Sequence, residues 1–163
     1  MTFPWFALRT RARAEKTVYD QLVRKQVEAF LPTVLKWSRW KDRKKQVEWP
    51  LFPGYCFAQF EPATSLRVLT CVGVASIVSF GSELAPIPEP EIESLRILVT
   101  STLKFDPAPF LKEGELVRVV HGPLKGVTGR LVRKGEKARL FLSVEMIGQA
   151  VSAEVDASDV VSF

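Results

Sequence analysis

The sequence predicts an α+β protein in which a mixed front domain is joined to a small all-β domain. Helical and strand-like patterns alternate up to about residue 101, whereas only short β-type runs occur beyond residue 110. Residues 102–110 separate these two textures, since they carry Pro107 and Pro109 among polar residues and show no helical or strand period. We therefore predict domains at 1–101 and 111–163, with a stiff linker at 102–110.

The front domain opens with a short apolar run at residues 5–8, which predicts a buried strand. Apolar residues then recur at three- and four-residue spacing over residues 14–30, which predicts an amphipathic helix that ends before Pro32. The basic, tryptophan-rich residues 36–49 predict two strands joined by a Lys/Arg turn. The elements predicted after them are a strand from the Pro53-Gly54 turn to residue 60, a helix or loop at 62–69, a strand at 76–80 and a helix at 91–103.

The back domain consists of short strands separated by glycine-containing turns. Five strands in roughly fifty residues predict a small closed barrel, because closure removes exposed strand edges. The predicted strands cover residues 116–120, 127–133, 138–144, 150–155 and 160–163.

Charge is distributed unevenly along the chain. Residues 1–50 hold 12 Lys/Arg against 5 Asp/Glu, a net charge of +7. The net charge is −3 for residues 51–100 (2 against 5) and +1 for residues 101–163 (9 against 8). A basic front third favours a polyanionic partner, with nucleic acid the first candidate, and is equally consistent with a charged surface that maintains solubility.

Several classes of protein are excluded by what the sequence lacks. Cys56 and Cys71 lie inside apolar runs, which predicts buried free thiols, and the single histidine, His121, has no co-ligand pattern for a metal. No nucleophile–base set or phosphate-binding glycine loop is present, so we expect neither an enzyme nor a cofactor. The longest uncharged run, residues 68–82, is shorter than the roughly 20 residues of a membrane span, and the N-terminus does not read as a signal peptide. We expect a soluble, monomeric cytoplasmic protein.

Residues 114–132 carry the most specific motif. A strand runs into the Gly122-Pro123 turn, Gly126 permits the positive φ of a tight return, and Gly129 marks a bend or bulge in the next strand. This stretch resembles the KOW motif, which occurs in NusG-type transcription factors and in some ribosomal proteins.

The front domain is independently similar to the N-terminal domain of the NusG family. The similarity is carried by residues 5–8, the helix before Pro32, residues 51–57, the segment 73–81 and the helix that follows Pro86. The family fold implies a four-stranded antiparallel sheet flanked by helices, tethered to a five-stranded SH3-like KOW barrel.

The resemblance implies that the front domain binds the clamp helices of the largest RNA polymerase subunit through an apolar depression. Aromatic residues around a Pro-Gly turn suit such a contact, although core packing is at least as good an explanation for Phe57. The positions that match the family's polymerase-binding surface are Phe52, Tyr55, Phe57, Phe80, Ile92 and Leu95.

The basic front segment would then face non-template DNA at the transcription bubble, where Lys and Arg hold phosphates. A mobile solvated tip is the alternative for the lysine-rich turn. The residues that we expect at DNA are Arg9, Arg11, Arg13, Lys41 and Arg43.

The resemblance assigns recruitment of a partner, either a small-subunit ribosomal protein or the termination factor Rho, to loops of the KOW domain. Capping of the barrel ends is an equally good explanation for the apolar residues among them. The matching loop positions are Leu124, Val127, Met146, Ile147 and Gly148.

Two alternatives remain from the sequence. The compact front domain also resembles the specialised paralogue RfaH, although the intact KOW glycines favour a permanent barrel and residues 65–70 differ from the DNA-reading loop of that paralogue. A ribosome-associated RNA-binding KOW protein is the second alternative, but it predicts a strongly basic back domain, and residues 101–163 are almost neutral.

Overall fold

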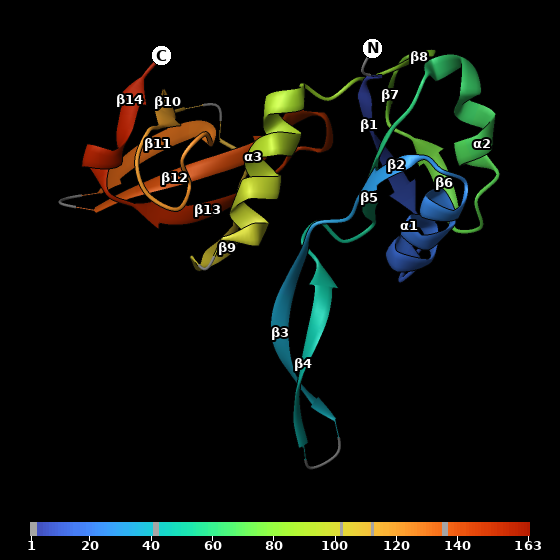
Figure 1. The fold of residues 1–163 in the computed structure, drawn as a ribbon, viewed down its shortest axis with the longest axis horizontal. Helices are drawn as coiled ribbons and strands as arrows, with labels where there is room; N and C mark the ends of the chain where they lie inside the picture. The colour runs from blue at the N-terminus through green and yellow to red at the C-terminus, as the bar shows by residue number, and fades with distance from the viewer. Residues whose placement is uncertain (1–2, 41–42, 102, 112, 135–136) are drawn as a thin grey trace. The chain divides into compact units, whose positions relative to one another are not determined.

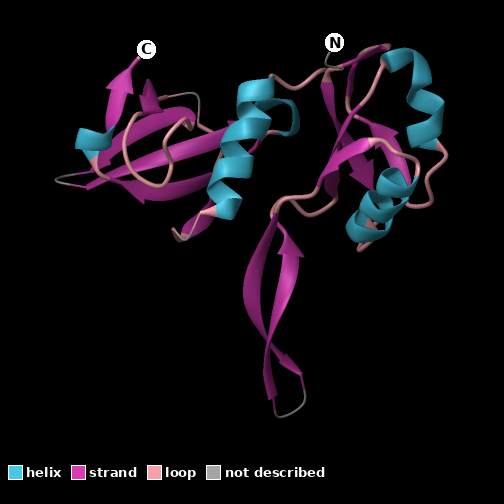
Figure 2. Cartoon of the chain, viewed as in Figure 1, coloured by secondary structure: helices cyan, strands magenta, loops and turns pink. Residues whose placement is uncertain are grey.

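The computed structural model describes residues 3–40, 43–101, 103–111, 113–134 and 137–163, with side chains outside 36–45 and 134. Its contacts divide the chain into two compact units, residues 1–86 and 87–163, which are described separately below. The described residues form a mixed α/β fold with three α-helices and several antiparallel sheets (Figures 1 and 2).

The first unit is built on a four-stranded antiparallel sheet of order β2-β5-β1-β6. Its elements are β1 (Trp5–Thr10), α1 (Glu15–Arg24), β2 (Glu28–Phe30), β5 (Tyr55–Gln59), a short α2 (Ser65–Leu69) and β6 (Val74–Ile77). Two hairpins extend this unit, one formed by β3 (Thr33–Trp40) with β4 (Arg43–Pro50) and one by β7 (Ser79–Phe80) with β8 (Glu83–Leu84).

Alternation along the central strands sorts their side chains onto two faces. On one face, Phe6 and Leu8 of β1 pack with Cys56 and Ala58 of β5 and with Val18 and Leu22 of α1 in a buried cluster. Both cysteines are free and buried in it, as the sequence predicts. Burial raises the pKa of the Cys56 thiol to about 12, although its hydrogen bond with the Phe57 backbone acts in the opposite direction.

The first helix is shorter than the apolar pattern predicts. It ends at Arg24, and Gln26 takes a left-handed conformation with φ of 60°. The backbone N–H of Val27 still donates to Leu22 O at 2.9 Å, which closes the helix end. The last residues of the predicted helix, Glu28–Phe30, instead form β2 and pair with β5, because strand pairing satisfies their backbone groups along the sheet.

The second unit contains α3 (Glu89–Thr100) and a six-stranded sheet of order β14-β10-β11-β12-β13-β9. The strands are β9 (Phe105–Ala108), β10 (Glu115–Val119), β11 (Thr128–Lys134), β12 (Lys137–Val144), β13 (Gln149–Val155) and β14 (Val160–Ser162). Five of them, β10 to β14, match the predicted strands to within one residue at every end. Alternate side chains such as Val117, Leu140 and Val151 form the buried side of the sheet.

The boundary between the units differs from the sequence prediction. The prediction placed the helix around residues 91–103 in the front domain, whereas its contacts in the structure group it with the C-terminal sheet. The predicted linker 102–110 contains β9, which pairs with β13 from Phe105↔Ala153 to Ala108↔Ala150. Pro107 lies within this strand and Pro109 follows it, and prolines are usually taken as evidence against a strand. Pro107 is tolerated because β9 is an edge strand of the sheet.

No helix within the described ranges is both long and apolar enough to cross a membrane. In the same part of the chain, no group of His, Cys, Asp and Glu side chains is arranged to hold a metal ion.

Candidate interaction surfaces

The Pro53-Gly54 turn is fixed by two backbone–backbone hydrogen bonds and one hydrogen bond from the backbone to a side chain. Gly54 adopts a φ of 86°, which favours glycine, and its carbonyl accepts from Thr10 N–H at 2.8 Å. Tyr55 N–H donates to Phe52 O at 3.1 Å across the turn. The buried Glu15 carboxylate accepts from Gly54 N–H at 3.4 Å. The turn is therefore attached both to the end of β1 and to the start of α1.

Tyr55 is half-buried and lies opposite Arg9 on the neighbouring strand. The central guanidinium carbon of the exposed Arg9 lies 5.9 Å from the centre of the Tyr55 ring, which is cation–π geometry. A predicted polymerase-contact residue and a predicted DNA-contact residue are thus neighbours on one surface.

Phe52 does not point outward as its position beside a turn implied. Its side chain is only 3% exposed and meets the buried Phe57 edge-on, with ring centres 6.3 Å apart. Leu51 N–H donates to Pro32 O at 2.8 Å, which brings the chain onto the sheet before the turn begins. Phe52 and Phe57 are therefore both packed inside their own unit, and neither side chain faces outward in this structure.

Phe80 shows the opposite behaviour. It lies on the short β7–β8 hairpin beside Gly81, whose φ is 63°, and its side chain is 79% exposed. A phenylalanine this exposed contributes little to packing within its own unit, so it is free to contact another molecule.

Ile92 and Leu95 lie on the buried side of α3, where each is only 1% exposed. The helix packs on β11 and β12 of the C-terminal sheet. Ser94 Oγ accepts from the backbone N–H of Thr128 at 3.0 Å, and Glu91 Oε1 accepts from the backbone N–H of Glu145 at 3.1 Å. In this arrangement neither Ile92 nor Leu95 is accessible to another protein.

Three of the arginines predicted to contact DNA, Arg9, Arg11 and Arg13, are exposed at the end of β1 and in the segment that follows it. Arg11 N–H donates to Gly73 O at 2.7 Å, and Arg13 has a left-handed φ of 63°. Arg11 and Arg13 line a cavity of about 490 Å³ together with Thr17 and Val72. Two other DNA predictions are not addressed: Lys41 lies outside the described residues, and of Arg43 only the backbone, in β4, is described.

The KOW-like loop positions separate into two groups. Leu124 and Val127 are 2% and 0% exposed, so their side chains are packed inside the C-terminal unit in this structure. Met146 and Ile147 are half-buried and Gly148 is exposed with a φ of 63°. These three residues remain available as a loop surface.

The backbone at Gly126 agrees with the prediction from the motif, whereas the backbone at Gly129 differs from it. Gly126 has a φ of 96°, as a tight return requires. Gly129 lies in a regular ladder opposite Val117, without a bulge. A Cβ at residue 129 would lie 2.6 Å from Phe141 O, so glycine is required there by close backbone approach.

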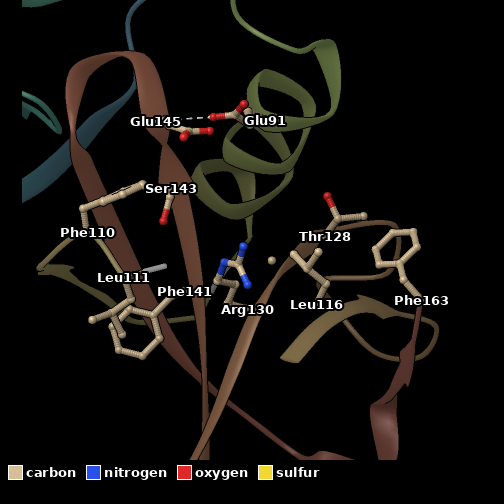
Figure 3. A pocket seen from close by; sticks show the side chains of 11 residues that line it. Glu91, Phe110, Leu111, Leu116, Thr128, Arg130, Phe141, Ser143, Glu145 and Phe163 are labelled. Atoms are coloured by element: carbon tan, nitrogen blue, oxygen red, sulfur yellow. Dashed lines mark hydrogen bonds between the residues drawn. The ribbon is translucent and has the colours of Figure 1, made fainter. Parts of the chain in front are cut away.

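One group of residues was missed from the sequence. Leu116, Arg130 and Phe141 are direct neighbours across β10, β11 and β12, on the side of the sheet opposite the buried Leu131 and Leu140. They border a cavity of about 400 Å³, drawn in Figure 3. Period-two alternation could have identified Arg130 and Phe141 as outward residues, but their pairing across strands depends on register.

Comparisons with known proteins agree with this architecture. A family model described as "Transcription termination factor nusG" matches residues 3–96. The transcription termination/antitermination protein NusG of Thermus thermophilus is 30% identical over 186 aligned positions, which cover 99% of each chain. The protein of the same name from Helicobacter pylori (strain J99) is 26% identical, with 96% of each chain covered.

A solved structure supports the fold alone. The structure described as "Domain interaction in Thermotoga maritima NusG" aligns with 98% of this chain and 97% of that one, at a TM-score of 0.52 and 16% identity. Both the matched region and the near-complete coverage lead to one assignment: the chain belongs to the NusG family of transcription termination and antitermination factors.

Proposed function

We propose that this chain regulates transcription elongation by binding RNA polymerase through residues 1–86 and recruiting a partner protein through residues 87–163. The similarity to termination/antitermination proteins extends over nearly the whole chain, which supports a role that uses both units. We interpret the C-terminal sheet as the KOW barrel of this family. In this proposal the chain acts by binding other macromolecules and not by catalysis.

The exposure of Phe80 carries the polymerase part of the proposal. Aromatic side chains bury a large area while losing few rotamers, and they are enriched at the centres of interfaces. Phe80 is 79% exposed at a hairpin, and Tyr55 is the second accessible aromatic residue of the predicted set. We propose that these two residues contact the clamp helices of the largest polymerase subunit.

The other predicted polymerase residues receive different roles. Phe52 and Phe57 support the contact from beneath, because their edge-on packing holds the Pro-Gly turn that carries Tyr55. Ile92 and Leu95 could reach polymerase only if α3 separated from the C-terminal sheet, since both are buried against their own unit.

Non-template DNA is the second proposed contact of the front unit. Arg9, Arg11 and Arg13 are exposed within five residues of one another, which concentrates positive charge at one end of β1. Trp49 on β4 is 47% exposed and could stack on an unpaired base.

The partner of the C-terminal unit is proposed to be a protein, either a small-subunit ribosomal protein or Rho. The loop surface formed by Met146, Ile147 and Gly148 is accessible in part, whereas Leu124 and Val127 are not. The near-neutral charge of residues 101–163 favours a protein over RNA at this surface.

Titration of purified core RNA polymerase with the labelled full chain tests the proposal. Phe80→Ala and Tyr55→Ala should each weaken binding by about 2 kcal/mol, roughly 30-fold in Kd. Leu66→Ala is the matched control, since Leu66 is 70% exposed in the same unit but lies on α2. Equal affinities for Phe80→Ala, Leu66→Ala and the unaltered chain would refute the assigned surface.

Ribosome-associated RNA binding is the alternative function. It predicts that the chain shifts a structured RNA in a gel at physiological salt and leaves the rate of a purified elongation complex unchanged. We expect the reverse, with altered pausing or termination and weak, salt-sensitive RNA binding.

A further inference from the structure

The outward side of the C-terminal sheet carries a row of three unlike residues. Arg130 pairs in register with Leu116 on β10 and with Phe141 on β12, so an arginine is flanked by an aliphatic and an aromatic neighbour. The row forms one wall of the cavity of about 400 Å³ seen in Figure 3. Volumes of this size accommodate a few side chains or a small ligand.

Arg130 has no acidic partner among the side chains that the structure describes. Its Nη1 donates to Gly114 O at 3.1 Å, which uses a small part of the donor capacity of a guanidinium. None of the ion pairs formed by the described side chains includes Arg130. By contrast, Arg139 on the next strand is 3.1 Å from the Asp106 carboxylate and also donates to Ser152. Arg130 is thus a partly buried cation whose remaining donors face a cavity.

Ser143 adds a second polar group without a partner. Its Oγ is buried and has no hydrogen-bond partner in the described chain. Figure 3 shows the hydroxyl directed toward the same space as the guanidinium. A buried hydroxyl without a partner costs stability, so its presence in the wall is consistent with a role other than folding.

The remaining walls are apolar and accessible. Leu116 is 50% exposed and Phe163 is 71% exposed, while Phe110 and Leu111 are half-buried at the other side. An apolar border lowers the local dielectric around Arg130 and strengthens its attraction for a carboxylate. The surface therefore favours a ligand that presents both an acidic and an apolar group.

The two ends of the cavity carry opposite charge. Glu91 and Glu145 lie together at one end, joined by the hydrogen bond to the Glu145 backbone, as Figure 3 shows. Their carboxylates repel a second acid placed at that end, so an acidic ligand group is confined to the vicinity of Arg130. The same repulsion disfavours a phosphate backbone running along the cavity.

We propose that this cavity is a docking site for a short segment of a partner protein in which an acidic side chain lies beside an aromatic or branched apolar one. The carboxylate pairs with the Arg130 guanidinium, and the apolar side chain packs against Leu116 and Phe141. The residues that line the cavity do not include Met146, Ile147 or Gly148. The proposed docking site therefore extends the proposed function without depending on it.

Selection from a displayed library of random heptapeptides tests the proposal with a defined probe. The immobilised full-length chain should enrich sequences with Glu or Asp next to Phe, Leu or Ile. The best peptide, synthesised with a fluorophore, is then titrated with the chain and its variants. Selection without such a motif, or with a basic motif, would overturn the proposal.

Arg130→Gln should weaken peptide binding at least 10-fold, because the charge-assisted pair is removed. Arg133→Gln is the matched control, since Arg133 is exposed on the same strand but does not line the cavity. Exchanging the acidic residue of the peptide for its amide should cause the same loss of affinity in the unaltered chain and no further loss in Arg130→Gln. Independent, additive losses would show that the acid binds elsewhere.

Two further measurements cover the case in which Arg130→Gln does not fold and the case in which the ligand is a nucleic acid. If Arg130→Gln unfolds, Arg130→Lys retains the charge, and the amide peptide still measures the pairing without altering the protein. A short fluorescent oligothymidylate is titrated in parallel. Tight binding of this oligonucleotide that Arg130→Gln abolishes would identify a nucleic-acid site and contradict the peptide proposal.

Discussion

Ser94 on α3 accepts a hydrogen bond from the backbone N–H of Thr128 on β11, with 3.0 Å between nitrogen and oxygen. The serine is 3% exposed, so this bond lies in the interface between the helix and the sheet. It joins the helix to the first residue of the strand that follows the KOW-like turn. The attachment of α3 therefore depends on a polar contact as well as on Ile92, Leu95 and Leu98.

Ser94→Ala should destabilise the C-terminal unit by about 1–3 kcal/mol, because the Thr128 N–H is left buried without an acceptor. Ser143→Ala is the contrasting variant, since its buried hydroxyl has no hydrogen bond within the described chain. We expect unchanged or higher stability for Ser143→Ala. All four tryptophans lie within residues 1–49, so unfolding of this unit should be followed by amide hydrogen exchange and not by fluorescence. Equal destabilisation by both substitutions would show that the hydrogen bond between Ser94 and the Thr128 N–H does not contribute to stability.

Glu91 makes the stability of the C-terminal unit depend on pH. Burial raises the pKa of its carboxyl above the usual 4.5, the hydrogen bond from Glu145 N–H lowers it, and the Glu145 charge raises it. A raised pKa means that the folded state binds the proton more readily than the unfolded state. The contribution of Glu91 is therefore most favourable below pH 4.5 and is lost as pH rises through the raised value.

Glu91→Gln should remove this dependence, because the amide oxygen can still accept from Glu145 N–H and carries no charge. The variant should be at least as stable as the unaltered chain at neutral pH, with a flatter profile of unfolding free energy between about pH 4 and pH 7. Glu93→Gln is the control, since its side chain is exposed. A profile that is unchanged in Glu91→Gln would rule out this group as the source.

Gly129→Ala should be strongly destabilising. The new methyl would lie 2.6 Å from Phe141 O, and a backbone oxygen within a paired strand cannot move away easily. Overpacking of this kind costs about 1–3 kcal/mol or more. Gly148→Ala meets nothing within 4 Å and carries only the penalty of its φ of 63°, about 1 kcal/mol. Urea denaturation followed by far-ultraviolet circular dichroism should rank the two variants in this order; the opposite ranking would contradict the close approach.

Arg11→Gln combined with Arg13→Gln should reduce the salt dependence of binding to an elongation complex. For single-stranded DNA, removing one phosphate-binding cation lowers the slope of log K against log salt by about 0.7. Arg24→Gln is a suitable control, because it removes one exposed positive charge from the far end of α1. A slope that does not change in the double variant would show that these arginines are not at the phosphates.

The strand pattern was the most predictable part of the fold, since alternation and glycine turns fixed the five main strands of the C-terminal sheet to within about a residue. The end of α1 was not predictable, because Val27 and Phe30 continue the helical apolar spacing while Gln26 breaks the backbone at a φ of 60°. Nothing in residues 26–30 signals that break, and pairing of β2 with β5 decides their conformation.

The candidate surfaces were predictable only in part. The positions that match the family's polymerase-binding surface include Phe80, which is exposed, and Phe52, whose ring packs edge-on against the buried Phe57. The sequence does not distinguish these two orientations. The apolar face of α3 could pack against either sheet, and the sequence alone does not choose between them. The site around Arg130 could not be predicted from the sequence, because Leu116 and Phe141 are distant from it along the chain. They become its neighbours only through the register of the paired strands.

The two buried thiols give the front unit a chemical reporter of its own. Only a thiolate reacts with an alkylating agent, and a pKa of about 12 leaves almost none at Cys56 in the folded state. Because Cys56 and Cys71 belong to the cluster that joins α1 and α2 to the sheet, alkylation by iodoacetamide requires that cluster to open. The rate of labelling therefore measures how often the front unit opens, and it should fall when polymerase holds this unit closed.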